Sequence, residues 1–166
     1  MVNAIRALGG GALYDHEATD MVTPDGIANA EEHWWTDLFH SIRIVSLEGD
    51  VVTDDNFPDL GQLDELVSVG LIGTRISGRT LRLLSTTRIE TIEIKGGSVV
   101  DDDLVWLARI PSLTHIYLSR VAVTDAGVRH LCTLRRLKAV GLQNTRVTPA
   151  GAARLEACTG AKVFLE

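Results

Sequence analysis

The stretch Leu113–Leu134, LTHIYLSRVAVTDAGVRHLCTL, decides the fold of this 166-residue chain. Its first half alternates apolar and polar residues around Ile116, which is the pattern of a short strand with one buried face. In its second half, apolar residues recur every third position from Val128, which places them on one face of a helix. Thr124 and Asp125 suit the start of that helix, as N-cap residue and as a negative charge at the positive end of the helix dipole. The stretch therefore predicts one strand followed by one helix.

The same unit occurs five times along the chain. Its first apolar column recurs at intervals of 24, 23, 24 and 24 residues, at Ile42, Leu66, Ile89, Leu113 and Leu137. A sixth, truncated copy contributes Val163 and Leu165. One unit of this size cannot bury the apolar faces of both its strand and its helix, whereas stacked units bury them against their neighbours. The repeat predicts an α/β solenoid with a parallel sheet backed by helices.

The composition agrees with a folded single domain of this architecture. Hydrophobic residues make up 45% of the chain and charged residues 23%, but aromatic residues only 5%. Strand residues that contact only the strands above and below must be narrow, which favours Leu, Val and Ile over aromatic residues. The net charge of −6 argues against a nucleic-acid or anionic-membrane surface, and no apolar run is long enough to span a bilayer. Cys132 and Cys158 are too few for a disulfide framework or for a zinc site built on cysteine pairs.

The repeat resembles that of bacterial leucine-rich repeat proteins whose units read L-x-x-L-x-L-x-x-T-x-V-T-D-A-G-L-x-x-L-x-x-L. Val123–Leu134 matches this pattern with Val128 in place of the usual Leu, and the resemblance covers residues 42–165. It implies a right-handed solenoid with parallel strands on the concave face and helices on the convex face. Two units depart from T-D-A-G, at Ser77–Thr80 and Val100–Asp103. The column that carries a buried Asn ladder in many such proteins here holds Asp50, Thr74, Gly97, Val121 and Thr145. Other polar groups must therefore stabilise the corner.

Residues 1–41 lie outside the repeat, and we expect them to form an N-terminal cap on the solenoid of residues 42–166. Residues 4–8 before Gly9–Gly11 predict a short helix with a glycine stop, and residues 12–17 predict a weak strand. Residues 31–40 predict a helix whose Trp34 and Trp35 cover the first repeat, with partner binding as the alternative role of the tryptophans. The segment also resembles the region before the repeats in similar bacterial proteins, where a membrane anchor often lies further upstream. A longer, membrane-anchored parent protein is therefore one interpretation, and the compartment stays open.

Residues that could carry chemistry have simpler structural roles in this pattern. The acidic runs Asp54–Asp55 and Asp101–Asp103 suit a hard cation, but their aligned positions place them in the first turn of a helix, where they stabilise its dipole. The five histidines form neither an H-x-x-x-H nor an H-E-x-x-H pair, and Gly9–Gly11 lacks the Lys-Ser/Thr of a phosphate loop. Cys158 occupies an apolar helix column as a small buried residue, and Cys132 lies beside such a column. We expect no catalytic residue, no metal and no cofactor.

Strand residues that alternate with the buried columns face the open, concave side of the sheet, where leucine-rich repeat proteins generally bind their partners. The resemblance implies a binding surface there, and its part richest in side chains consists of Thr91, Glu93, Lys95, His115, Tyr117, Ser119 and Gln143. The predicted function is a non-enzymatic protein–protein interaction module with a protein partner of unknown identity, and without nucleic-acid or membrane contact. A solvated sheet face that binds nothing is the plain alternative.

Two alternatives come from other classes of protein. No helix is predicted after Val163–Leu165, so the last strand could present an unpaired edge through which two copies form a homodimer. Such a chain would be a structural or self-associating module. The second alternative is a very small hydrolase or metal-dependent enzyme, which metal analysis and a generic esterase or phosphatase assay would test.

Overall fold

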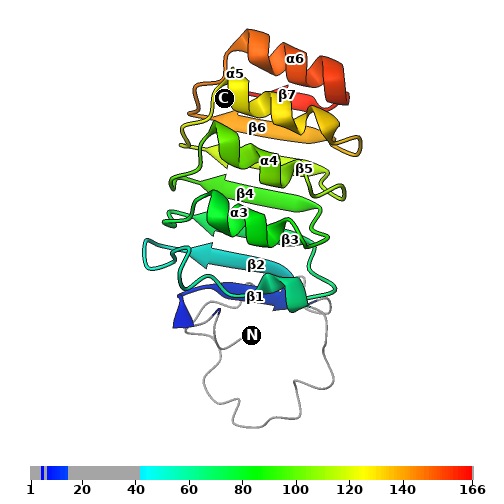
Figure 1. Ribbon diagram of the computed structural model, residues 1–166. Coiled ribbons are helices and arrows are strands. Elements are labelled where there is room, and N and C mark those ends of the chain that lie inside the picture. The colour runs from blue at the N-terminus through cyan, green and yellow to red at the C-terminus, as the bar shows by residue number, and fades with distance from the viewer. Residues whose placement is uncertain (1–4, 6, 15–41, 166) are drawn as a thin grey trace.

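The computed structural model describes residues 5, 7–14 and 42–165, and in this part of the chain seven strands form one sheet in sequence order (Figure 1). The strands are β1 (Gly11–Tyr14), β2 (Ile42–Glu48), β3 (Ser68–Ile72), β4 (Thr91–Lys95), β5 (His115–Ser119), β6 (Ala139–Gln143) and β7 (Lys162–Phe164). Strands β2 to β7 are parallel, and β1 pairs antiparallel with β2. Each predicted unit contributes one strand, which confirms the stacked parallel sheet.

The helical segments lie together on one side of this sheet (Figure 1). They are η1 (Leu60–Gln62), α3 (Gly78–Leu84), η2 (Asp101–Asp103) leading into α4 (Leu104–Leu107), α5 (Asp125–Val128) leading into η3 (Arg129–Thr133), and α6 (Pro149–Thr159). The predicted helix of the first unit is a single 3₁₀ turn, and the third and fourth units combine α and 3₁₀ geometry. The α/β solenoid is confirmed, with shorter helices than the sequence indicated.

The core consists of the apolar columns that define the repeat. The strands are paired so that equivalent residues of successive units lie side by side. Two rows on the helix side of the sheet are at most 1% exposed: Val45, Val69, Ile92, Ile116 and Val140, and Leu47, Leu71, Ile94, Leu118 and Leu142. Strands lie about 4.8 Å apart, so a row accepts only side chains of similar, narrow shape. This spacing accounts for an aliphatic core with few aromatic rings.

A left-handed residue ends each strand at the same position of the repeat. The residues are Gly49, Gly73, Gly96, Arg120 and Asn144, with φ of 91°, 65°, 79°, 56° and 53°. In the first four, the backbone N–H donates a hydrogen bond to the carbonyl of the last residue of the next strand. Glycine adopts this conformation without steric cost, and asparagine is tolerated there. These backbone bonds tie each strand exit to the next repeat, without an Asn ladder.

Carboxylates that cross from one repeat to the next stabilise the corner between strand and helix. Asp101 accepts hydrogen bonds from the backbone N–H and the hydroxyl of Thr124, at 2.7 and 2.6 Å. Asp125 accepts the same two bonds from Thr148 in the following repeat, both at 2.7 Å. These bonds hold the pKa of Asp125 below its ordinary value, and the positive charge of Arg154 acts in the same direction. The T-D pair is therefore a link between repeats.

Asp54 forms the corresponding link between the first two repeats. It accepts hydrogen bonds from the backbone N–H and hydroxyl of Ser77, at 3.0 and 2.6 Å, and from those of Thr80, at 3.1 and 2.6 Å. Partial burial raises the pKa of Asp54, but these four bonds outweigh it, and the net pKa lies below its ordinary value. The prediction that Asp54 lies in the first turn of a helix was wrong, because η1 begins only at Leu60. For Asp101, the first-turn placement is confirmed, but its carboxylate binds the next repeat.

The glycine of T-D-A-G leaves room for this carboxylate. A Cβ atom at Gly151 would overlap the carboxylate of Asp125, and one at Gly127 would lie 2.9 Å from the Cα of Asp101. Closer approach than about 3 Å does not occur for real Cβ atoms, so another residue at either position would displace the link. The threonine, aspartate and glycine of the motif thus act together at the last two junctions, from Asp101 to Thr124 and from Asp125 to Thr148.

The N-terminal prediction is testable only in part. Ile5 and Ala7 are helical, Ile5 is fully buried, and its carbonyl accepts hydrogen bonds from the N–H groups of Leu8 and Gly10 at 3.2 and 3.0 Å. The strand predicted over residues 12–17 is β1, which starts at Gly11 and pairs with β2. The helix predicted over residues 31–40, with its two tryptophans, lies outside the described residues.

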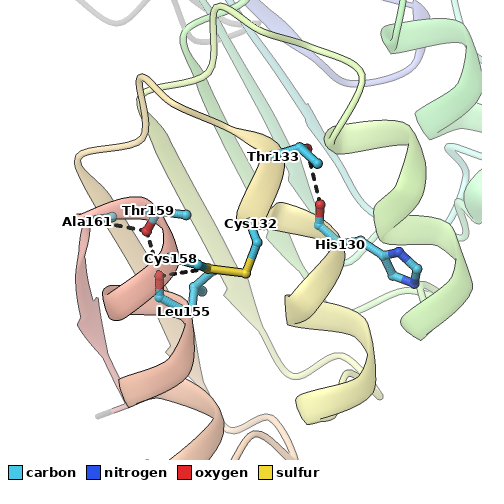
Figure 2. Close-up of a disulfide and its surroundings, with 7 residues drawn as sticks. All are labelled: His130, Cys132, Thr133, Leu155, Cys158, Thr159 and Ala161. Carbon is cyan, nitrogen blue, oxygen red and sulfur yellow. Dashed lines mark hydrogen bonds between the residues drawn. A yellow bond between two sulfur atoms is a disulfide. The ribbon is translucent and has the colours of Figure 1, made fainter.

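Cys132 and Cys158 form a disulfide with their Cα atoms 5.4 Å apart. Figure 2 shows the bond bridging η3 and α6, the helical segments of the fourth and fifth repeats. Beside it, Thr159 donates a hydrogen bond to the carbonyl of Leu155 at 2.7 Å and accepts one from the N–H of Ala161 at 3.1 Å. The prediction that Cys158 is simply a small buried residue was therefore wrong. Although the two cysteines build no framework, they join two repeats covalently.

Candidate binding surface on the open face of the sheet

The face of the sheet opposite the helices, called the open face below, carries the seven predicted site residues. Strand pairing places them in three rows across β4, β5 and β6: Thr91 beside His115, Glu93 beside Tyr117, and Lys95 beside Ser119 and Gln143. None of the seven is buried. The strict alternation of the strands fixes this arrangement, because neighbouring residues on one strand point to opposite faces.

A hollow of about 460 Å³ lies on the C-terminal half of the open face. Seven residues line it: Glu93, Tyr117, Leu118, Ser119, Gly141, Gln143 and Phe164. Four of the predicted site residues are among them, whereas Thr91, Lys95 and His115 lie on the same face but do not line the hollow. Its volume falls within the range of about 300–1,000 Å³ that is common for ligand pockets.

One row across four strands forms the base of this hollow. It runs from Glu93 on β4 through Tyr117 on β5 and Gly141 on β6 to Phe164 on β7. Tyr117 is 39% exposed and Phe164 51%. A Cβ atom at Gly141 would lie 2.9 Å from a carbon of the Tyr117 ring, so the glycine allows this ring to lean over the sheet. The row thus combines a carboxylate, two exposed aromatic rings and a glycine over which the first ring leans.

Gly141 and Phe164 were absent from the predicted set of site residues. Phe164 pairs with Gly141 across the sheet, and the 23 residues between them lie within the interval of 23 to 24 residues between units, so the column that supplied Tyr117 also contains both residues. The signal was therefore present in the sequence. It was missed because the last strand was considered as a sheet edge and glycine has no side chain to attract attention.

The polar groups of the open face make few contacts with one another. No ion pair joins Glu93 to Lys95 or to another described residue. The ring of His115 stacks beside that of Tyr117, with centroids 6.3 Å apart and an interplanar angle of 18°, and its Nδ1 lies 2.8 Å from the hydroxyl of Thr114. In the described parts of the chain, no group of three or more His, Cys, Asp or Glu side chains is placed to hold a metal ion. Thr114 is buried, and its hydroxyl donates a hydrogen bond of 3.1 Å to the carbonyl of Glu90, so its contact with His115 fixes the position of the imidazole on the sheet.

The repeat period, the in-register parallel strands and the helices on one side of the sheet together decide the type of fold. The chain folds as a leucine-rich repeat solenoid. No family model and no curated protein matches its sequence. Across the described ranges, no helix is long and apolar enough to cross a membrane.

Solved structures similar to this leucine-rich repeat solenoid include two internalins from Listeria monocytogenes. The internalin InlF shares 12% sequence identity with a TM-score of 0.42, over 63% of this chain and 36% of that one. Internalin C2 shares 14% identity with a TM-score of 0.36, over 75% of this chain and 79% of that one. The solenoid thus spans little more than a third of the length of InlF.

Proposed function

We propose that this leucine-rich repeat solenoid is a non-enzymatic protein–protein interaction module that binds a protein partner through its open face. The observation that carries the proposal is the hollow lined by Glu93, Tyr117 and Phe164. Exposed aromatic residues that surround a concave surface are the side chains most often found at the energetic centre of protein interfaces. The other predicted residues of the face, Thr91, Lys95 and His115, flank this centre and would contribute peripheral contacts.

Self-association through the edge of β7 stays a prediction, and one contact weighs against it. The N–H of Lys162 donates to the carbonyl of Lys138, so the N–H of Val163 points away from β6 toward the free edge. There it donates a hydrogen bond of 2.9 Å to a carboxylate oxygen of Glu156 on α6. A covered edge donor and a nearby negative charge both disfavour the addition of another strand.

Site-specific crosslinking tests the proposed function. p-Benzoylphenylalanine replaces Tyr117 in one variant and, as a matched control, Leu83 in another, because Leu83 is 49% exposed and lies on α3 on the helix side. We expect a crosslinked partner from position 117 and none from position 83. Equal crosslinking from both positions would contradict binding through the open face.

A combined substitution provides the complementary measurement. Glu93→Ala, Lys95→Ala and Tyr117→Ala together should leave the circular dichroism spectrum unchanged, because all three side chains are exposed. The same variant should lose its partner in a pull-down. Glu65→Ala with Arg136→Ala, two exposed residues beside the strand entries, serves as the control. An unchanged partner set in the triple variant would sink the proposal.

A further inference from the structure

We propose that the hollow on the open face binds a basic side chain, an arginine or a lysine, of the protein partner. The inference rests on the proposed function and adds the chemistry of the central contact. Glu93 supplies a carboxylate at one end of the row, and the rings of Tyr117 and Phe164 follow it across the sheet. A cation can pair with the carboxylate and rest on an aromatic face at the same time.

The carboxylate of Glu93 is available for such a pair. Its side chain is exposed, it lines the hollow, and it forms no hydrogen bond or ion pair with another described residue. The exposed acidic residues Asp50 and Asp55 differ in this respect, because each pairs with an arginine at 2.7 Å, Arg75 and Arg79 respectively. Among the described residues, Glu93 thus has no counter-ion, and it lines the hollow.

The two rings and the glycine between them shape the space beside the carboxylate. Tyr117 and Phe164 lie on strands two apart in the sheet, a separation of roughly 10 Å between backbones. Gly141 lets the Tyr117 ring lean over the neighbouring strand, because a Cβ atom at this position would lie 2.9 Å from a ring carbon. A planar guanidinium suits a carboxylate beside an aromatic ring, because it stacks on the ring and binds the carboxylate through paired N–H donors. The geometry favours arginine over lysine.

Trp106, on the helix side of the sheet, is an aromatic ring that already has cations of this chain beside it. The guanidinium carbons of Arg82 and Arg109 lie 5.4 and 4.6 Å from the centre of this ring. In the described parts of the chain, no cation lies over Tyr117 or Phe164. With respect to residues 42–165, the two rings of the open face can thus accept a cation from a partner.

Lys95 gives a second prediction about the charge of the ligand. It lies two residues after Glu93 on β4 and faces the same side, but it does not line the hollow. The positive charge of Lys95 repels a cation that enters the hollow, although solvent screens part of this repulsion. Lys95→Gln should therefore strengthen the binding of a basic side chain in the hollow. If Lys95 also makes a peripheral contact with the whole partner protein, the same substitution should weaken the binding of that protein.

The test uses two short peptides and nuclear magnetic resonance of the ¹⁵N-labelled chain. Acetyl-Gly-Arg-Gly-amide is the probe, and acetyl-Gly-citrulline-Gly-amide, which has nearly the same shape without the charge, is its control. We expect the arginine peptide to shift the amide signals of Glu93, Tyr117, Gly141 and Phe164 at millimolar concentrations, and the citrulline peptide to bind at least about fivefold more weakly. Glu93→Gln should remove most of this preference. Glu90→Gln, an exposed carboxylate just before β4, should leave it unchanged.

The outcomes separate this inference from the proposed function. Equal binding of the two peptides, an unchanged preference in Glu93→Gln, or weaker arginine binding in Lys95→Gln would each overturn the basic side chain as the ligand. If the basic side chain is overturned in this way, but the partner found by crosslinking is absent from the pull-down with the triple variant, the proposed function holds without this inference. If the arginine peptide binds as expected but the triple variant keeps its partner set, the hollow binds a cation and the proposed function is wrong.

Discussion

Removing the Cys132–Cys158 disulfide should lower the free energy of unfolding by about 3.5 kcal/mol. The two cysteines lie 26 residues apart in the sequence. For a closed loop of that length, the chain-entropy relation gives a change of about −11.8 cal/mol/K in the unfolded state, which corresponds to about 3.5 kcal/mol at 25 °C. In a solenoid each repeat contacts only its neighbours, so the loss should be concentrated at the junction of η3 and α6.

The variant Cys132→Ala with Cys158→Ala tests this value in guanidinium unfolding followed by circular dichroism. Hydrogen exchange then locates the effect, with faster exchange expected in α6 and β7 and little change in α3. The matched control is the wild-type chain in a reducing agent, which removes the bond without changing a side chain. A loss below about 1 kcal/mol, or exchange that accelerates equally in α3 and α6, would refute the reasoning.

Three further predictions follow from individual side chains. The pKa values of Asp54 and Asp125 are lower in the folded than in the unfolded chain, so their contribution to stability is complete above about pH 4 and is lost as the pH falls below it. Urea midpoints between pH 6 and 3 should therefore fall less steeply in Asp54→Asn with Asp125→Asn, and an equal slope would contradict the assignment. The buried Oγ1 of Thr74 has no hydrogen-bond partner in the described part of the chain. Thr74→Val should therefore raise the free energy of unfolding by roughly 1 kcal/mol in thermal unfolding, and a decrease would contradict this assignment. Glu156→Ala should expose the N–H of Val163 and increase self-association in sedimentation equilibrium, and an unchanged monomer fraction would show that this carboxylate does not protect the edge.

The architecture was predictable because the information for it is local and repeated. Alternation around Ile116 assigns a strand, spacing from Val128 assigns a helix, and a period near 24 residues places both next to their copies. Stacked rows then follow from the spacing of strands alone. The same alternation predicted that the seven site residues lie on the open face. A period of two residues specifies the face of the sheet on which a side chain lies, and nothing more.

Contacts between repeats were harder to predict because they depend on the kind of helix. Cys132 lies seven residues after Asp125, and Cys158 lies nine residues after Pro149, so the cysteines occupy different columns of the repeat. The α5–η3 segment rises about 12.5 Å over its seven steps because η3 is a 3₁₀ helix, and α6 rises about 13.5 Å over nine. The two cysteines thus lie at nearly the same distance along their helices, although they occupy different columns of the repeat. The sequence pattern does not distinguish the two helix types, so the alignment hid the disulfide.

The role of the aspartates was missed for a different reason. Hydrogen bonds from Thr124 to Asp101 and from Thr148 to Asp125 join residues 23 apart, which is the repeat period less one. A search within one unit assigns these carboxylates to their own helix, because helix starts favour acidic residues. Only the comparison of a Thr with the Asp of the preceding unit reveals the link.

The covalent link and the candidate site are connected through the last repeat. Phe164 is the second ring of the hollow, and it lies on the three-residue strand β7. Besides its pairing with β6 and the packing of Val163 on the core, this strand is held by the Glu156 carboxylate, which binds the N–H of Val163. The disulfide fixes the helix that carries Glu156. Loss of the disulfide should therefore loosen the position of Phe164 while leaving Glu93 and Tyr117 on strands β4 and β5 in place. The arginine peptide would then lose one of its two aromatic contacts, so we expect it to bind the open face more weakly when the bond on the opposite side of the sheet is removed.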